Sequence, residues 1–561
     1  MSQMKENKKK KLKKHIRGAI PLIQKIAKRM KLREILTHYI QPHGNEKIYA
    51  VDTLLLLIYN LAIEKNPLYE LSEWCSVQDV SALGIQQQNR WFTFTDDRFG
   101  KALDKLYLAD RSSLMTEIVT TVVKQFDISM DRIHNDSTSV KAFGKIPGIT
   151  RTGLELKKGV SKDHRPDLKQ LVFSLSISSD GAVPIHHKCY SGNRTDDTTH
   201  IETWNTLRKI TGRADFLYVA DSKLCTQKQL SYIVGKGGRA ITILPETWSE
   251  VNRFKQELLK TAKSKTRIWR RQKPGSDTEE EYFSVFKGKQ VTKKEGFRIH
   301  WIYSNEKRKR DRSSREINLK KLEKKFMEVN SSINTGKLKS FEQIKNKIVE
   351  IREEGKSVES FVWNRLNSKS KIKKAQVGKG RPSKKTKYRE ITETYYTLTW
   401  GRNKEELNRQ NRIDGIFPLL STDESLSSLD VLKAYKYQPR LEKRFEQLKQ
   451  IHLIAPLLFK KIDRVEANMF AFFIGLLIQT LLEREVRLNM KNNEIEKMYI
   501  YPEQRECKNP TTAIIFDRFS NVSRYEIFKG NRLAEEYRDE LSKTQKDILR
   551  MIEMNEDTYW D

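Results

Sequence analysis

The sequence predicts an α/β protein whose centre is a mixed β-sheet with helices packed on it. Between residues 130 and 245, short apolar runs with strand periodicity alternate with segments of helical periodicity. The chain has 561 residues, which is enough to bury two or more hydrophobic cores. It carries 107 lysines and arginines against 72 acidic residues, and this net charge of +35 attracts polyanions such as nucleic acid. Such a charge does not suit an ordinary enzyme of neutral metabolites.

Residues 1–125 are predicted to form a helical N-terminal domain with a basic arm. The segments "AVDTLLLLIYNLAI" and "FGKALDKLYLADRSSLMTEIVTTVVKQF" carry apolar residues at the three-to-four spacing of amphipathic helices. We expect this domain to contact DNA or to mediate dimerisation. The alternative is a plain helical cap with a solubilising tail.

Residues 126–245 are predicted to form the first part of the sheet-containing core. Three strands come first, and the step "SSDGAV" between the second and the third is a hairpin signal. The strands are "RIHNDSTSV", "LKQLVFSLSISSDG" and "AVPIHHKCYSGN". The helix "TTHIETWNTLRKI", the strand "FLYVAD", the helix "TQKQLSYIVGKGG" and the strand "RAITIL" follow. This order of three strands, helix, strand, helix, strand is the order of a ribonuclease-H-like core.

Residues 246–425 interrupt this pattern and are interpreted as a basic insertion without an independent core of its own. Charged helices, "SNEKRKRDRSSREINLKKLEKKF" and "SFEQIKNKIVEIREEG", are flanked by the strand-like "FRIHWIYS" and "YYTLTWG". The stretch "KKAQVGKGRPSKKTK" is expected to be a flexible basic loop. Residues 426–490 are expected to return to the core as helices, with a break at Pro439. Residues 491–561 form a C-terminal region with a strand-like "PTTAIIF".

One apolar segment, "ANMFAFFIGLLIQTLL" at 467–482, raises the question of a membrane. Its 16 residues fall short of the roughly 18 to 20 that span a bilayer, and we expect a buried helix. The basic N-terminus lacks the apolar run of a signal peptide. The four cysteines are scattered and include no CxxC pair, which favours a reducing cytoplasmic compartment without disulfides or structural zinc. In a bacterium, the charge suggests association with the nucleoid.

Two aspartates end apolar strands in the region of sheet periodicity. Asp136 lies in the first strand, and Asp221 follows "FLYVA" at the end of the fourth. Phosphoryl transfer on a DNA backbone uses two Mg²⁺ ions roughly 4 Å apart, held by hard carboxylate oxygens. The alternatives are structural: Asp136 as an Asx-turn residue and Asp221 as a helix cap.

A third carboxylate is expected from a helix of the C-terminal part of the core. In "YKYQPRLEKRFEQLKQ", Glu442, Phe445 and Lys449 follow one another at i, i+3 and i+7 and share a helix face. A carboxylate and a lysine on one face suit a site that holds metal and phosphate. The alternative is a generic charged helix.

Together these segments resemble a DDE transposase of the insertion-sequence 4 superfamily, and are most similar to the insertion-sequence 1634 type. The resemblance covers roughly residues 130–490. It rests on "HNDSTSVKAFG", "SKDHRPDLKQLVFSLSISSDGAVPIHHKCYSGNRTD", "YVADSKLC", "YKYQPRLEKRFEQLK" and "LFKKIDRVEANMFAFFIGLLIQTLLERE". It implies a catalytic and metal-binding triad of Asp136, Asp221 and Glu442 with two Mg²⁺ ions, for which Mn²⁺ can substitute. The family's insertion lies between the second aspartate and the glutamate, in the position of the basic insertion here.

The superfamily signature is tyrosine, two residues, arginine, three residues, glutamate, six residues, lysine. Tyr435, Glu442 and Lys449 are in register with it, whereas Gln438 occupies the arginine position. Arg440 is the substitute that we expect to contact phosphate, together with Tyr435 and Lys449.

A further DNA contact is predicted in the basic loop. "VGKGRPSKK" resembles an AT-hook, whose Gly-Arg-Pro centre enters the minor groove of A·T-rich DNA, and here places Arg381 at that centre. Chance occurrence of a basic Gly-Pro loop is the alternative. Trp248, Trp269 and Trp363 are candidates for stacking on an unpaired base or for core packing.

The predicted function is excision and integration of an insertion sequence by metal-dependent phosphodiester hydrolysis and strand transfer at its terminal inverted repeats. The expected partners are double-stranded DNA, at the element ends and at the target, and a second copy of the chain in a homodimer, with no membrane. The alternative is a non-catalytic, sequence-specific DNA-binding protein derived from a transposase. A structural RNA-binding protein would explain the charge but not the acidic residues at strand ends.

Overall fold

The structure is a computed structural model of a mixed α/β protein with many helices. It describes residues 10–42, 46, 48–79, 94–142, 148–159, 167–194, 198–261, 263–273, 276, 278–336, 338–449, 459, 461–503 and 505–561. The chain divides into two compact units, one formed by Met1–Thr242 with Leu432–Asp561 and the other by Ile243–Val431.

The first unit contains a sheet of mixed direction in which the strands follow the order β4-β3-β2-β5-β6. The strands are β2 (Arg132–Ala142), β3 (Lys169–Ser178), β4 (Pro184–Ser191), β5 (Leu217–Val219) and β6 (Arg239–Ile243). β3 is antiparallel to both β2 and β4, whereas β5 is parallel to β2 and to β6. The hairpin predicted between β3 and β4 is closed by the Ser178 amide, which donates to the Val183 carbonyl at 2.9 Å.

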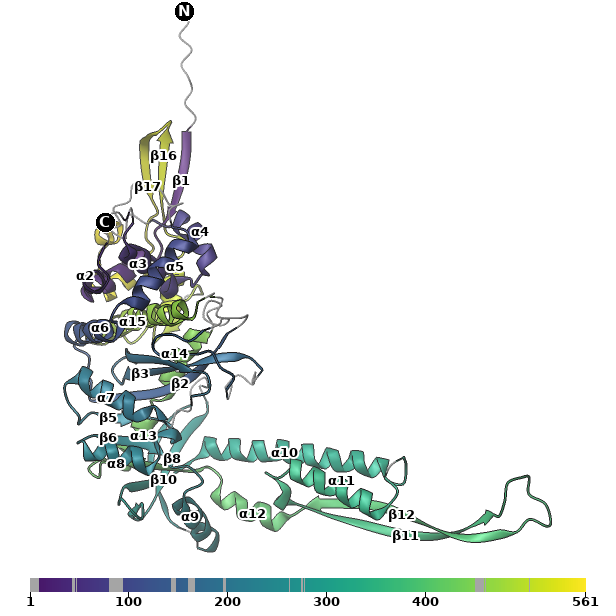
Figure 1. Ribbon diagram of the computed structural model, residues 1–561. Helices are drawn as coiled ribbons and strands as arrows, with labels where there is room; N and C mark the ends of the chain where they lie inside the picture. The colour runs from purple at the N-terminus through teal and green to yellow at the C-terminus, as the bar shows by residue number, and fades with distance from the viewer. Residues whose placement is uncertain are drawn as a thin grey trace, which may run out of the picture. The chain divides into compact units, whose positions relative to one another are not determined.

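Two helices connect the parallel strands of this sheet, and the predicted element order is confirmed. They are α7 (His200–Thr211), between β4 and β5, and α8 (Gln227–Gly235), between β5 and β6 (Figure 1). α8 joins the parallel neighbours β5 and β6, which a tight turn cannot connect, whereas α7 leads from β4 past β3 and β2 to β5. β3 is buried along nearly its whole length, as expected of a central strand covered on both faces.

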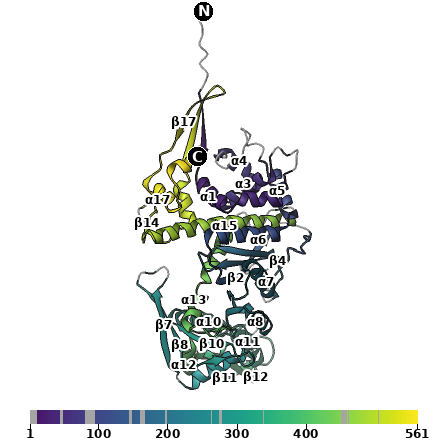
Figure 2. The ribbon, with the colours of Figure 1, turned by 90° about the vertical axis from the view of Figure 1, so that its left-hand side faces the viewer.

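The N-terminal residues of the first unit are mostly helical, as predicted, and pack against one long apolar helix. The helices are α1 (Ile20–Arg29), α2 (Leu32–Tyr39), α3 (Ala50–Ile63), α4 (Leu71–Val77), α5 (Asp96–Leu108) and α6 (Arg111–Phe126). The long helix is α15 (Ile462–Asn492), which Figure 2 shows crossing beneath α1, α3 and α5. An added Cβ at Gly475 would lie 3.3 Å from the Ile58 carbonyl of α3, so the two backbones approach closely there.

α15 is a buried core helix, as predicted from its sequence. By length and composition it is the one helix of the described chain that could cross a membrane, because it contains an apolar window of 18 residues. However, 94% of that apolar window is buried inside the structure, as in the core helix of a soluble protein.

Two features of the chain termini differ from the predictions. Part of the basic arm, β1 (Lys10–Ile16), is a strand that pairs with β16 (Ser523–Lys529), and β17 (Arg532–Arg538) completes this sheet. The predicted strand "PTTAIIF" is wrong, because Thr512–Phe519 form helix α16 with Thr512, Ile515, Phe516 and Phe519 buried. The remaining C-terminal elements are β14 (Met498–Tyr499), β15 (Glu506–Cys507), α17 (Lys543–Met551) and α18 (Glu556–Trp560).

The second unit contains an antiparallel sheet and a set of charged helices. Its strands are β7 (Lys265–Gln272), β8 (Glu280–Phe286), β9 (Gln290–Val291), β10 (Arg298–Ser304) and β13 (Ile416–Ser421). Their order is β13-β10-β8-β7, with β9 paired to β10. The helices are α9 (Ser249–Lys260), α10 (Asn305–Ser332), α11 (Phe341–Glu354) and α12 (Lys404–Ile413).

The second unit has a hydrophobic core, and the expectation that this stretch lacks one is wrong. Leucine, isoleucine, valine and phenylalanine side chains of α10 and α11 pack on the root of a long hairpin formed by β11 (Val362–Gln376) and β12 (Tyr388–Arg402). The core members are Leu319, Leu322, Phe326, Val329, Ile333, Ile344, Ile348, Ile351, Val358, Phe361, Val362 and Leu398. The abundant charges between them obscure this apolar stripe in the sequence.

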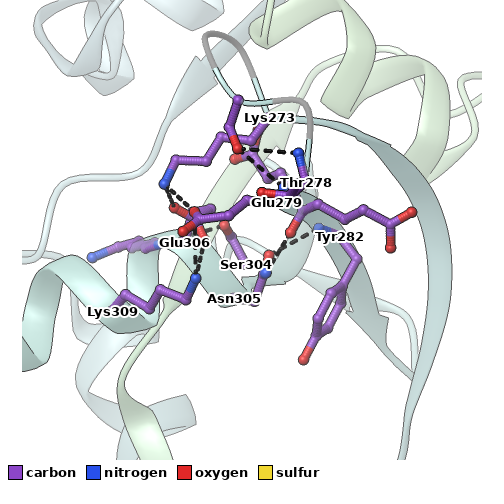
Figure 3. Close-up of polar contacts among 12 residues, drawn as sticks. Lys273, Thr278, Glu279, Tyr282, Ser304, Asn305, Glu306 and Lys309 are labelled. Carbon is purple, nitrogen blue, oxygen red and sulfur yellow. Dashed lines mark hydrogen bonds and ion pairs between the residues drawn. The ribbon is translucent and has the colours of Figure 1, made fainter.

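The start of α10 is held by a network of charged and polar side chains, which Figure 3 shows. Glu306 forms ion pairs with Lys273 at 3.1 Å and with Lys309 at 2.9 Å, and Lys273 also contacts Glu279 at 2.5 Å. The side-chain oxygen of Asn305 accepts a hydrogen bond from the Tyr282 amide of β8 at 2.8 Å. These contacts fix the helix to the adjacent hairpin of the sheet.

Candidate active site

The two aspartates predicted as metal ligands come from neighbouring strands and fall at the same level of the sheet. β2 and β5 pair in parallel, with Arg132 opposite Leu217 and His134 opposite Val219. Asp136 follows this paired segment by two residues within β2, and Asp221 follows it by two residues after the end of β5. Neighbouring strands lie about 4.8 Å apart, so the two aspartates leave the paired segment at the same end.

Each aspartate also has a structural hydrogen bond. Asp136 lies within β2 and not in a turn, and its Oδ1 accepts a hydrogen bond from the backbone amide of the next residue, Ser137, at 2.7 Å. Asp221 caps the short 3₁₀ helix Ser222–Leu224, and its Oδ1 accepts the Lys223 amide at 3.0 Å. An ionised carboxylate has two oxygens with about four acceptor sites, so these bonds orient the group and are compatible with metal binding.

Gln438 docks the glutamate-bearing helix on β2. It ends the turn between α13 (Ser428–Tyr435) and α14 (Pro439–Lys449), and its side chain is buried. Its Nε2 donates to the Asn135 carbonyl at 2.9 Å, and its Oε1 lies 3.2 Å from His134 Nδ1. An amide oxygen only accepts, so this contact requires His134 protonated on Nδ1. Burial lowers the pKa of His134 to about 3, so this histidine is neutral.

A buried ion pair fixes α14 from its other side. Arg444 Nη1 lies 3.0 Å from Glu483 Oε2 of α15, with both side chains less than a tenth exposed. The same guanidinium donates to the carbonyls of Gly181 and Ala182 in the β3–β4 turn, at 3.3 and 3.4 Å. Helix α14 is therefore attached both to the strand that carries Asp136 and to the core helix.

The three predicted carboxylates all influence the ionisation of Tyr435. Burial, followed by the negative charges of Asp221, Asp136 and Glu442, raises the pKa of Tyr435 to about 12. All three carboxylates therefore act on one phenol. That phenol stays protonated at neutral pH, where it can donate a hydrogen bond.

The other predicted residues divide by where they lie. Arg440 is exposed, with its guanidinium 5.5 Å from the centre of the Tyr437 ring. Lys449 is the last residue of α14, and its side chain lies outside the described residues. Arg381 is exposed in the second unit, in the loop between β11 and β12. Phe445 is buried with Leu441 and Leu448, so it belongs to the packed face of α14.

The three tryptophans have different surroundings. Trp269 stacks on Phe283 with ring centres 5.3 Å apart, which is a packing role. Trp248 precedes α9 and is partly buried. Trp363 is 51% exposed at the start of β11 and remains a candidate for stacking.

The donor set suits a hard divalent cation, because it contains carboxylates and no cysteine. Within the described ranges, no three side chains of His, Cys, Asp or Glu are close enough together to hold a metal ion as they stand. Glu442 is exposed on α14, whereas Asp136 and Asp221 are partly buried. To complete such a site, the side chain of Glu442 would have to move toward the two aspartates, and it is the longest and most exposed of the three.

The sequence pattern did not indicate the positioning role of Gln438 or of Arg444. In the sequence, Gln438 differs from its neighbours only in occupying the position of an expected arginine, and its hydrogen-bond partners lie about 300 positions earlier in the chain. A buried arginine in a helix rich in lysine and glutamate carries no local signal. Such residues become visible only when the fold supplies their partners.

Comparisons with known proteins give a matching family model and a similar solved structure. A family model described as a domain of unknown function, DUF4277, matches residues 13–120, which lie outside the candidate site. No curated protein matches the chain. Among solved structures, a piggyBac transposase in a synaptic complex with hairpin DNA is similar at 10% identity and a TM-score of 0.25. That similarity covers 48% of this chain and 58% of the other.

Proposed function

We propose that the protein is a DDE transposase that cuts and joins DNA at the ends of an insertion sequence of the 1634 type. It would bind the terminal inverted repeats as a homodimer, hydrolyse the phosphodiester at each end and transfer the freed 3′-hydroxyl to target DNA. The sheet order β4-β3-β2-β5-β6, with its antiparallel start and parallel end, supports a ribonuclease-H-like catalytic core.

The observation that carries the proposal is the placement of Asp136 in β2 and of Asp221 just after the paired parallel strand β5, with the charges of both and of Glu442 acting on Tyr435. A structural explanation accounts for each aspartate alone, as a cap or a backbone acceptor. It does not account for three carboxylates from three elements whose charges all act on one phenol in a protein of net charge +35. Mutual repulsion of three carboxylates is unfavourable unless a cation or another compensating group shares the site.

Asp136, Asp221 and Glu442 would hold two Mg²⁺ ions. Bound there, the ions would supply Lewis-acid stabilisation of the attacking and leaving oxygens. The protein's own part is orientation. The backbone bonds of Asp136 and Asp221 fix their carboxylates, and Gln438 and Arg444 fix α14. Tyr435, neutral at physiological pH, would donate a hydrogen bond to a phosphate oxygen, and Arg440 and Lys449 would contribute positive charge.

The test is strand cleavage on the protein's own flanking DNA. Labelled duplexes covering the sequence on either side of its reading frame are incubated with full-length protein and Mg²⁺ or Mn²⁺. Nicks at fixed positions are expected. Asp136→Asn, Asp221→Asn and Glu442→Gln should each lower the rate by roughly 1000-fold or more, because metal-based charge stabilisation contributes several kcal/mol.

Glu446→Gln is the matched control, because Glu446 is exposed on the same helix and has the same charge as Glu442. Its cleavage rate should stay within about twofold of the unmodified protein. Bound Mn²⁺, counted by paramagnetic resonance, should fall in the three triad variants and not in the control. Tight binding of the flanking DNA without cleavage in any variant would refute the transposase and support the non-catalytic DNA-binding protein.

A further inference from the structure

The hairpin of β11 and β12 extends well beyond the core that supports it. Figure 1 shows the two strands running past the end of α11. Each strand has 15 residues, which at about 3.3 Å per residue makes a ribbon of roughly 50 Å. From Ser370 to Thr394 its residues are exposed or only partly buried. A two-stranded ribbon alone in water is at best marginally stable, so an extended one calls for a partner.

The root of this hairpin is firmly held. Arg402 of β12 bridges two glutamates of α10, with 2.8 Å contacts to both Glu316 and Glu323. The side-chain amide of Asn334 bonds both the amide and the carbonyl of Tyr396, each at 2.8 Å. Asn334 holds the outer edge of β12, whereas the side chains of Arg402 and the core residue Leu398 lie on the face of the ribbon toward the helices. The alternate residues of each strand therefore form the opposite face.

That opposite face, here called the ribbon face, is defined by strand register. In β11 it takes alternate residues from Trp363, and the pairing places Tyr395 opposite Lys369 and Arg389 opposite Ala375. Its basic and aromatic members are Trp363, Arg365, Lys369, Lys371, Lys373, Arg389 and Tyr395. Glu393 is its one acidic residue. It accepts a hydrogen bond from Tyr395 at 2.7 Å and lies 3.7 Å from Lys373.

The charge of the hairpin is strongly one-sided. Residues 362–402 contain eight lysines and four arginines against two glutamates, a net charge of 12 − 2 = +10. Five of the twelve cations lie on the ribbon face, whereas the opposite face of the strands has Lys374 and the ion-paired Arg402. Within the described chain, Lys369 and Lys371 have no ion-pair partner, although a carboxylate lies directly across from Lys371.

We propose that the ribbon face docks in the major groove of double-stranded DNA. The choice of DNA as the polyanion rests on the proposed function, but the docking itself needs no cleavage. The major groove of B-form DNA admits a two-stranded β-ribbon. Lys369, Lys371 and Lys373 are spaced by about 6.6 Å, which matches the roughly 6.8 Å covered by two phosphates along one strand of the duplex. The lysines therefore follow a phosphate row while Tyr395 contacts the groove.

The test measures the salt dependence of binding to a 30-base-pair DNA duplex of mixed sequence. The full-length Asp221→Asn protein is used, so that cleavage does not interfere, and fluorescence anisotropy is recorded between 50 and 200 mM KCl. The triple variant Lys369→Ala, Lys371→Ala, Lys373→Ala loses three phosphate contacts. The slope of log affinity against log salt should therefore become shallower by about 2.7, and affinity at 100 mM should fall at least tenfold.

The matched control removes the same charge from exposed lysines of the same unit, through Lys320→Ala, Lys324→Ala and Lys345→Ala on α10 and α11. This variant should keep the original slope within about 1. Equal losses in the two triple variants would show that only net charge matters and would overturn the proposal. Circular dichroism of both variants checks that they are folded.

An RNA duplex of the same length distinguishes groove docking from general attraction to a polyanion. The A-form major groove is too deep and narrow for the ribbon, so the ribbon-face variant should change RNA binding much less than DNA binding. Equal losses on RNA and DNA would overturn groove docking. Failure of cleavage with an intact ribbon effect would reject the transposase alone, whereas cleavage without a ribbon effect would reject the ribbon alone.

Discussion

Replacing Gln438 by leucine tests whether this buried amide positions the catalytic helix. The change keeps the approximate volume of the side chain and removes both of its hydrogen bonds, to the Asn135 carbonyl at 2.9 Å and to His134 Nδ1 at 3.2 Å. His134 Nε2 already lacks a hydrogen-bond partner among the described residues, so the ring would lose its remaining hydrogen bond there and keep its packing against Tyr437.

The magnitude follows from the two groups left behind. Each buried polar group without a partner costs about 1 to 3 kcal/mol, so two of them cost about 4 kcal/mol at the midpoint. Burial of the apolar leucine side chain offsets roughly 2 kcal/mol of this loss. The docking of α14 on β2 should therefore weaken by about 2 kcal/mol, which corresponds to a roughly 30-fold change in the opening equilibrium of this helix.

Hydrogen exchange followed by mass spectrometry measures this opening directly, whereas a global melt of a chain with two compact units need not be two-state. Amides of Leu441–Leu448 should exchange about 30-fold faster in Gln438→Leu, while those of α15 keep their protection. Lys443→Leu, at an exposed position of the same helix, is the control for the leucine itself. Unchanged exchange in α14 would refute the positioning role of Gln438.

Three further predictions concern neighbouring features. Arg444→Met should lower the protection of the α14 amides from hydrogen exchange by about 3 kcal/mol, because the buried Glu483 loses its 3.0 Å ion pair and keeps the one with Arg487 at 3.5 Å, and a second change, Glu483→Gln, should recover part of the loss. Tyr435→Phe should slow cleavage about 10-fold or more through loss of one hydrogen bond to phosphate. Because the pKa of Tyr435 is raised to about 12, the phenol stays protonated below pH 10, so the rate ratio of the two proteins should be constant from pH 7 to 9.5, and a drift in that range would contradict the raised pKa. Arg381→Ala should weaken binding to an A·T-rich duplex several-fold more than to a G·C-rich one if the loop enters the minor groove, and equal effects would leave a plain charge contribution.

The order of strands and helices between 130 and 245 was predictable because each element has a clear local period and is bounded by glycine or aspartate. "PTTAIIF" was misassigned because its β-branched residues suggest a strand. The helical spacing of Thr512, Ile515, Phe516 and Phe519 appears only when the window is extended to residue 519. Strand β1 gives almost no signal, since it is mostly lysine, and its partner β16 lies more than 500 residues away.

Most of the long hairpin was missed for a related physical reason, although the strand-like "YYTLTWG" is the end of β12. A strand is recognised from alternating burial, and the outer part of β11 and β12 has no buried side to alternate with. Its lysines recur with a period of two, but exposed loops and solvated helices are equally rich in lysine. The predicted flexible loop is therefore wrong at its start, where Lys373–Gln376 belong to β11, and only residues 377–387 connect the strands.

The structural and the catalytic interpretations of the two aspartates turn out to be complementary. A free aspartate side chain at a strand end samples several rotamers, and holding it for a metal ion costs entropy. In Asp136 and Asp221 a backbone amide already binds one carboxylate oxygen, at 2.7 and 3.0 Å, so that cost is met when the chain folds. Within the part of the chain that the structure describes, Glu442 has no such backbone bond, and it is the exposed member of the three. The proposed site would therefore consist of two fixed ligands and one mobile ligand, with the position of the mobile one set by Gln438 and Arg444 through α14.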